Sequence, residues 1–193
     1  PVIAEDLAQG GVFQLEGSGM RAFLTGMRPE NFEDIIAAIS LYRPGPMESI
    51  PRYVRGKHDP DSVRYLSPLL KPILEVTYGC MVYQEQVMQI VRDLAGYSLG
   101  RSDLMRRAMS KKNRDVMQKE RAYFVHGMHD EAGNLVIPGC VANGVPEAVA
   151  EAIFDEMSAF ASYAFNKSHA AAYGVLAVQT AWLKHHHPVP FMA

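Results

Sequence analysis

Five cationic side chains gather in the segment LMRRAMSKKNRD, residues 104–115 of a chain whose net charge is −2. They are Arg106, Arg107, Lys111, Lys112 and Arg114. Between Arg101 and Arg121, eight Lys and Arg residues stand against three acidic residues, so this stretch carries +5 and the rest of the chain −7. Arginine offers a planar fork to phosphate oxygens, and lysine offers a compact charge. The segment predicts a site for a triphosphate or a nucleic-acid backbone, unless Asp115 and Glu120 balance an ordinary solvated face.

Helical spacing would place part of this charge on one face. The residues at i, i+3, i+4 and i+7 are Arg107, Ser110, Lys111 and Arg114. The side chains expected to face inward are Leu104, Met105, Ala108 and Met109. Like charges at this spacing repel by about 0.2–0.5 kcal/mol per pair, and a bound anion would relieve that repulsion.

A second cluster lies in SYAFNKSHAAAYG, residues 162–174. Asn166 suits the N-cap of a helix, which places Lys167, Ser168 and His169 in a first turn whose N–H groups attract anions. The alanines that follow would let a flat base approach closely. The alternative is a capped helix with a buried aromatic pair.

Weaker candidates accompany these two segments. Arg43 stands in the rigid loop of LYRPGPMES, and Gln84 opens a helix in YGCMVYQEQVMQI. Three groups have metal-binding residue types without the spacing or setting of a metal site: Asp59 with Asp61, His126 with His129, and residues 185–187. We therefore expect neither catalytic residues nor metal ligands in this sequence.

The elements that must hold these residues are mostly helices. Apolar spacing predicts helices over 32–42, 83–95 and 114–128, a helix capped by Ser102, and two more over 146–163 and 167–186. The last of these is expected to be the most buried element, and Pro188 to end it. Residues 51–72 are expected to form a mostly irregular connection, and a small β-hairpin is expected near 133–138.

Composition bounds the class of protein. With 193 residues, 48% hydrophobic and 21% charged, the chain can bury a substantial core. Two distant cysteines and no apolar run of membrane-spanning length fit a cytoplasmic protein. Because the sequence starts at Pro1 without Met and stops at PFMA, we expect a piece of a longer protein.

Several long strings, in order along the chain, carry a resemblance to a known family. They are GVFQLEGSGM at 11–20, LYRPGPMES at 41–49, YGCMVYQEQVMQI at 78–90, AGYSLGRSDLMRRAMSKK at 95–112 and SYAFNKSHAAAYGVLAVQTAWLKHHHPVPFMA at 162–193. They resemble the α (catalytic) subunit of bacterial replicative DNA polymerase III, in its DnaE form. The resemblance implies a mainly α, multi-helix fingers domain of a C-family DNA polymerase. It would form a single fragment over 1–193, irregular over 1–75 with one or two helices and helical over 76–193.

The resemblance also implies functions for the two clusters. The family's arginine pair, which contacts the triphosphate of the incoming dNTP, matches Arg106 and Arg107. Its nucleotide-pocket segment matches FNKSHA, so Asn166, Lys167, Ser168 and His169 are assigned to nucleotide binding. Lys111 and Lys112 join them from the basic segment. Arg43, Gln84 and Arg114 are further candidates for nucleotide or DNA binding.

The family's catalytic machinery lies elsewhere. The aspartates that bind catalytic Mg²⁺ belong to the palm domain, which precedes this segment in the family. The resemblance therefore implies a DNA-directed DNA polymerase only as the full-length protein, with template-primer DNA, dNTP, the sliding clamp and other replisome subunits as partners and no membrane. The competing interpretation is a stand-alone helical nucleic-acid-binding or scaffold module. An independent metallohydrolase is a third.

Overall fold

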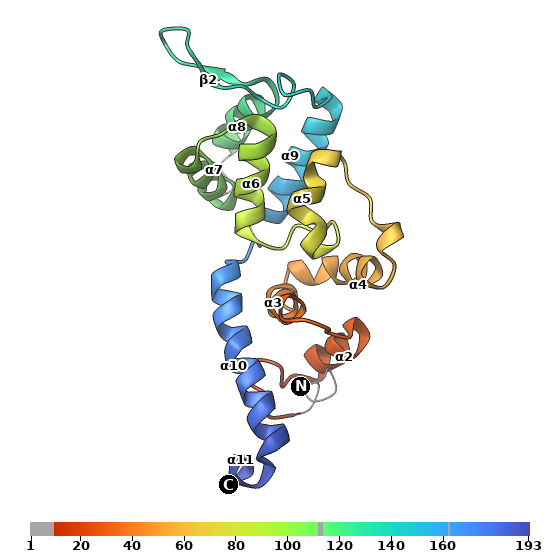
Figure 1. The fold of residues 1–193 in the computed structure, drawn as a ribbon. Coiled ribbons are helices and arrows are strands. Elements are labelled where there is room, and N and C mark those ends of the chain that lie inside the picture. The colour runs from red at the N-terminus through yellow and green to blue at the C-terminus, as the bar shows by residue number, and fades with distance from the viewer. Residues whose placement is uncertain (1–9, 112–113, 162) are drawn as a thin grey trace. The chain divides into compact units, whose positions relative to one another are not determined.

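The computed structural model describes residues 10–111, 114–161 and 163–193. Contacts within the chain divide it into two compact units, one formed by Pro1–Asp61 with Phe165–Ala193 and the other by Ser62–Ala164. The elements are mainly α-helices, as the sequence predicts (Figure 1). The single domain expected over 1–193 stays a prediction.

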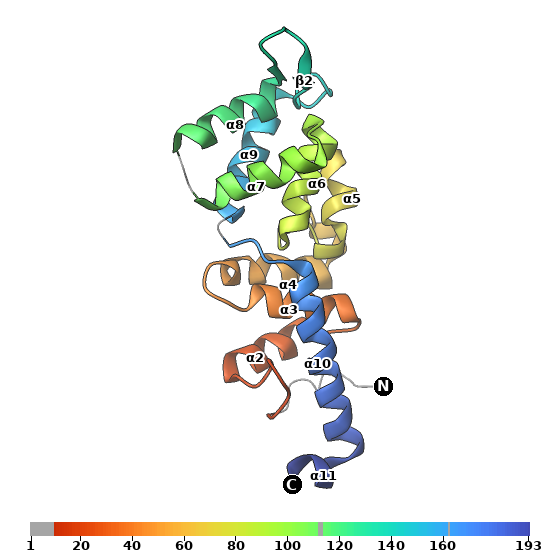
Figure 2. The same ribbon diagram turned by 90° about the vertical axis from the view of Figure 1, so that its left-hand side faces the viewer.

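The first unit is built on the long helix α10. Its elements are α2 (Ser18–Met27), α3 (Phe32–Leu41), the 3-10 turn η1 (Pro46–Ser49), α4 (Ile50–His58), α10 (Lys167–His186) and α11 (Pro188–Met192). The turn η2 (Pro60–Ser62) follows α4. α10 runs beside α3 in both views of the ribbon (Figures 1 and 2). Gly174 permits this approach, because a Cβ there would lie 3.1 Å from the ring of Phe32.

The helix predicted over 32–42 is confirmed as α3. Asn31 caps it by accepting a hydrogen bond from the N–H of Asp34, and Asp34 in turn accepts from the N–H of Asn31. This reciprocal arrangement satisfies two N–H groups that have no partner within the helix. Asp34 is itself buried, where it also pairs with Lys57 of α4 at 2.9 Å.

The irregular connection predicted over 51–72 is wrong for its first part, because α4 covers Ile50–His58. Pro51 does not prevent this helix, since a proline in the first turn removes an N–H that has no helical partner anyway. Tyr53 and Gly56 form the buried face of α4. Beyond α4 the connection holds the short turns Pro60–Ser62 and Pro68–Leu70, and a further short helix begins at Lys71.

The last helix is also less buried than expected. Small residues form the buried face of α10: Ala170, Gly174, Ala177 and Ala181. The larger apolar side chains Val175, Leu176, Trp182 and Leu183 are each 44–48% exposed. Composition alone suggested burial, but a straight helix can turn only one face toward α3. α10 ends at His186 as predicted, and Pro188 then begins α11.

The second unit is a helical cluster with a hairpin. Its elements are η3 (Pro68–Leu70), α5 (Lys71–Leu74), η4 (Glu75–Thr77), α6 (Gln84–Ala95), α7 (Leu99–Lys111), α8 (Arg114–His126), β1 (Met128–His129), β2 (Leu135–Ile137) and α9 (Glu147–Ala161). Side chains from α5 to α9 meet in one apolar core, in which Ile90, Phe124 and Phe154 are fully buried. α6 lies against α7 in both views (Figures 1 and 2).

The helix predicted over 83–95 is confirmed as α6. The side-chain oxygen of Gln86 accepts hydrogen bonds from the N–H groups of Val82 and Tyr83 at its start. Gly96 ends it with a φ of 78°, a conformation that glycine adopts at little cost.

The start of α7 differs from the prediction. Ser102 was expected to cap the helix, but α7 begins at Leu99 and Ser102 lies inside it, buried, with its hydroxyl donating to the carbonyl of Leu99. Ser98 serves instead, since its hydroxyl accepts from the N–H of Arg101 at 3.2 Å. Serine suits an N-cap at either position, and the residue type alone does not show that the helix starts one turn earlier.

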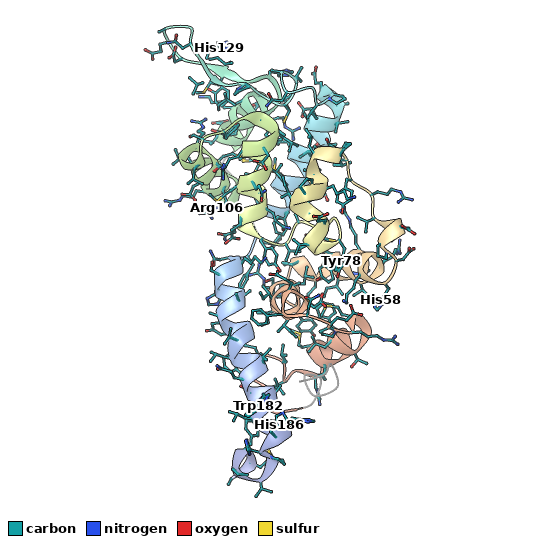
Figure 3. The ribbon with its side chains drawn as sticks, in the orientation of Figure 1. His58, Tyr78, Arg106, His129, Trp182 and His186 are labelled. Carbon is teal, nitrogen blue, oxygen red and sulfur yellow. The ribbon has the colours of Figure 1, made fainter. Side chains whose placement is uncertain are left out.

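The predicted hairpin is confirmed. β1 and β2 pair antiparallel, with Met128 opposite Ile137. Asp130 shapes the turn, because its carboxylate accepts hydrogen bonds from the N–H groups of Ala132 and Asn134. Figure 3 shows His129 in this hairpin. No helix in the described part of the chain combines the length and apolar character needed to cross a membrane.

Candidate functional site

The central helix of the basic segment, α7, is anchored by two methionines. Met105 and Met109 are fully buried, as predicted, and pack in the core of the second unit. Leu104 was expected beside them but is 61% exposed, because it lies about 100° around the helix from Met105. The anchored face leaves the polar side of α7 at the surface.

On that polar side, one carboxylate holds both arginines of the predicted pair. The Nε and Nη2 atoms of Arg106 lie 3.1 and 2.8 Å from Oδ1 of Asp103, and Nε of Arg107 lies 2.8 Å from Oδ2. The spacings are i, i+3 and i, i+4, with the acid on the N-terminal side, which favours such pairs. The pKa of the Asp103 carboxyl is lowered, chiefly because Arg106 donates a hydrogen bond to it.

The two arginines differ in exposure. The side chain of Arg106 is 18% exposed, whereas that of Arg107 is 65% exposed. Figure 3 shows Arg106 at the edge of the second unit. Arg106 therefore acts mainly as an anchor along the helix, and Arg107 is the member of the pair that can reach a ligand.

Other cations of the segment have structural partners. Arg101 pairs with Glu120, which is buried and also accepts a hydrogen bond from the hydroxyl of Tyr97 at 3.1 Å. Burial, with the nearby charge of Glu120, raises the pKa of the Tyr97 hydroxyl. Arg121 pairs with carboxylates of α9, those of Glu151 and Asp155. The local excess of +5 is thus partly balanced by acids outside the segment.

The structure describes only some of the remaining predicted residues of the second unit. Lys112 lies outside the described residues, and so do the side chains of Lys111 and Arg114. Gln84 is held by the chain itself, because its side-chain amide donates to the carbonyl of Ala164 at 3.0 Å. That contact gives Gln84 a structural role at the start of α6.

In the first unit, the FNKSHA segment begins α10 as predicted. Asn166 caps the helix, and its side-chain oxygen accepts from the N–H of His169 at 2.9 Å. Lys167 pairs with Glu33 of α3 at 2.8 Å. Ser168 and His169 are exposed at the first turn, where the helix end favours anions.

A row of contacting side chains runs from Phe165 along the start of α10, and sequence reasoning missed it. The guanidinium of Arg43 lies 4.1 Å from the ring centre of Phe165, which contacts His169 edge-on at 5.4 Å. His169 lies 4.5 Å from Tyr173, and Tyr173 stacks on Phe13 at 5.5 Å. The i, i+4, i+8 spacing of the three residues from 165 to 173 was the available signal. Burial lowers the pKa of Arg43.

Across the part of the chain that the structure describes, no three His, Cys, Asp or Glu side chains converge as metal ligands do. Nε2 of His126 instead lies 3.8 Å from a carboxylate oxygen of Glu147. Asp59 caps the C-terminal end of α4, and Asp61 lies in the turn η2.

Comparison with known proteins identifies the family. Residues 3–132 match the family model described as the bacterial DNA polymerase III alpha subunit finger domain. The chain belongs to this family. The chain is 51% identical over 201 residues to DNA polymerase III subunit alpha of Thermus aquaticus, and the alignment covers 100% of this chain and 16% of that protein. It is 46% identical over 194 residues to the subunit of the same name from Staphylococcus aureus strain N315, covering 99% and 17%. The chain therefore spans about a sixth of the length of these relatives.

Of the predicted residues, the structure brings together two sets. In the second unit, Arg106 and Arg107 meet at Asp103. In the first unit, Arg43 meets the start of the FNKSHA segment through Phe165. Lys167 forms an ion pair with Glu33 of α3.

Proposed function

We propose that the full-length protein is a DNA-directed DNA polymerase of bacterial replication. In this proposal, residues 1–193 bind the incoming dNTP and part of the template-primer DNA. Membership of the finger-domain family and two relatives named DNA polymerase III subunit alpha support it. The chain alone is not proposed to catalyse synthesis.

The observation that carries the nucleotide proposal is the exposed guanidinium of Arg107, held by Asp103 at the surface of an anchored helix. A guanidinium can donate two parallel hydrogen bonds to phosphate oxygens. Nucleotidyl transfer places growing negative charge on the pyrophosphate leaving group. Arg107 would bind the triphosphate and stabilise that charge, with Arg106 keeping the adjoining turn of α7 in place.

For the first unit, we propose contact with the base or backbone of a nucleotide or DNA strand. Ser168 and His169 are exposed at the start of α10, and the ring of His169 contacts the ring of Phe165. Aromatic faces and arginine stack on bases with little regard for sequence. Phe165 therefore joins the earlier candidates Arg43, Asn166, Ser168 and His169.

The remaining parts of the proposal concern the whole polymerase. Mg²⁺ would be held by parts of the full-length protein outside residues 1–193, and it supplies charge neutralisation for nucleotidyl transfer when bound. The sliding clamp and other replisome subunits are proposed partners of the full-length protein in the cytoplasm.

The test uses the full-length polymerase with Arg107→Ala. We expect the KM for dNTP to rise and kcat/KM to fall by about a hundredfold. This is the effect of losing charge-assisted hydrogen bonds that contribute about 3 kcal/mol. The melting temperature should stay within a few degrees of wild type, because Arg107 is mostly exposed. Arg92→Ala is the matched control, since Arg92 is exposed on the neighbouring helix α6. An equal effect of both substitutions, or a loss of activity that only tracks a loss of melting temperature, would contradict the proposal.

A further inference from the structure

Asp103 was not among the binding residues predicted from the sequence. We infer that Asp103 is the positioning residue of the arginine pair, whose single carboxylate fixes Arg106 to the helix and orients Arg107 toward phosphate. The inference rests on the proposed function of Arg107. It adds the residue that holds the binding group in its productive direction.

The geometry divides the carboxylate between the two arginines. Oδ1 receives two hydrogen bonds from Arg106, at 3.1 and 2.8 Å, and Oδ2 faces Nε of Arg107 at 2.8 Å. Contact through Nε leaves the two Nη groups of Arg107 at the far end of a side chain that is 65% exposed. Asp103 itself is only 31% exposed, so it lies between the helix and its arginines.

The physical benefit is preorganisation. An exposed arginine samples many rotamers, and fixing such a side chain upon binding weakens affinity about two- to tenfold. Asp103 fixes Arg107 before the ligand arrives. The same carboxylate also repels phosphate through its charge, so positioning and repulsion predict opposite effects when the charge is removed.

The substitution that separates them is Asp103→Asn. Asparagine has an NH2 group in place of one carboxylate oxygen, and this donor cannot accept from an arginine, so one of the two arginines loses its contact. If Asp103 positions Arg107, the KM for dNTP rises about five- to tenfold in the full-length polymerase. If Asp103 only opposes phosphate, the KM falls instead.

A double-mutant cycle with Arg107→Ala tests whether the effect passes through Arg107. In the Arg107→Ala background, Asp103→Asn should no longer raise the KM for dNTP, because the group it positions is absent and only the loss of repulsion, which lowers the KM, remains. Asp93→Asn is the matched control: it makes the same charge change at an exposed residue of α6 and should leave the KM unchanged in both backgrounds. Melting temperatures are measured for every variant. If Asp103→Asn proves too unstable, Asp103→Glu replaces it, since the longer side chain keeps the charge and displaces both contacts.

The outcomes separate this inference from the function on which it rests. No effect of Arg107→Ala alone overturns both. An effect of Arg107→Ala together with a lowered or unchanged KM in Asp103→Asn overturns only the positioning role. The same holds if the two substitutions multiply independently in the cycle.

Discussion

At the scale of single residues, the structure separates structural cations from those available to a ligand. Arg101, Arg121 and Lys57 each pair with carboxylates of the same unit, whereas Arg107 reaches outward from its pair with Asp103. Residue type alone makes all of them candidates for phosphate binding. Burial and the position of the nearest carboxylate decide which of them holds the fold together.

The buried pair of Asp34 and Lys57 should matter most for stability in the first unit. Asp34→Asn is expected to lower the free energy of unfolding by about 3 kcal/mol, because it removes the buried carboxylate 2.9 Å from the Lys57 ammonium and leaves the exposed Glu30 opposite that charge. The side chains of both residues are at most 4% exposed. Glu30→Gln is the control, since Glu30 also contacts Lys57 but is 79% exposed and should change stability by less than about 1 kcal/mol. Urea unfolding of the 193-residue chain measures both, and equal losses would contradict the assignment.

Cys140 predicts a dependence of stability on alkaline pH. Burial raises the pKa of its thiol from 9.0 to about 12. Between these values the unfolded chain loses a proton that the folded chain keeps, so stability falls as pH rises above 9 and is unaffected below it. The melting temperature should fall more in wild type than in Cys140→Ala between pH 8 and pH 10.5. Identical falls would show that other groups account for the alkaline loss.

At the scale of elements, the join between α8 and the hairpin depends on two glycines. Gly127 has a φ of 90°, and a Cβ there would lie 2.5 Å from the carbonyl oxygen of Ile137. A Cβ on Gly139, with a φ of 83°, would press against the backbone nitrogen of Gly127. The two chain segments therefore cross without room for any side chain. This crossing fixes how β2 leads back toward α9.

Gly139→Ala should accordingly destabilise the chain by about 3 kcal/mol or more, since backbone strain and a backbone clash add. Gly133→Ala provides the matched comparison. Gly133 has a similar φ of 81° but open space around it, so only the strain of about 1–2 kcal/mol applies. Thermal unfolding of both variants gives the difference. A Gly139→Ala variant no less stable than Gly133→Ala would show that the crossing relaxes easily.

At the scale of the whole molecule, the net charge is small, but the positive charge is concentrated in one stretch of the sequence. The chain carries −2 overall, yet the stretch from Arg101 to Arg121 carries +5. Such a distribution favours binding of an anion at one place over general attraction to polyanions. Because the chain spans about a sixth of the length of its relatives, that binding is expected to serve a reaction completed by other parts of the protein.

We therefore predict that residues 1–193 alone do not extend a primer. The resemblance places the Mg²⁺-binding aspartates in the palm, so the purified chain with template-primer, four dNTPs and Mg²⁺ should give no product. A gel-based extension assay measures this, with the full-length polymerase as the positive control. Metal-dependent extension that survives repeated purification would contradict the prediction.

Much of the fold could be read from local spacing. The boundaries of α3 and α6 and the hairpin follow from apolar periodicity, caps and turn residues, all of which act within a few positions along the chain. The start of α7 could not be read in this way, because Ser98 and Ser102 are both suitable caps. α4 was missed since a proline suits a helix start as well as a loop.

By itself, the sequence determined which residues could bind phosphate: the cations of 106–114 and the capped turn at Asn166. It also carried the strings by which the family resemblance was found. Helical spacing had already placed Arg107 on the charged face, and only the tertiary structure decided that Arg106 is held at Asp103 with its side chain 18% exposed. It alone placed Phe13 and Arg43 beside the helix that begins at Lys167. The physical reason is that exposure and contacts between distant segments depend on which faces pack together, and a one-dimensional pattern does not specify that.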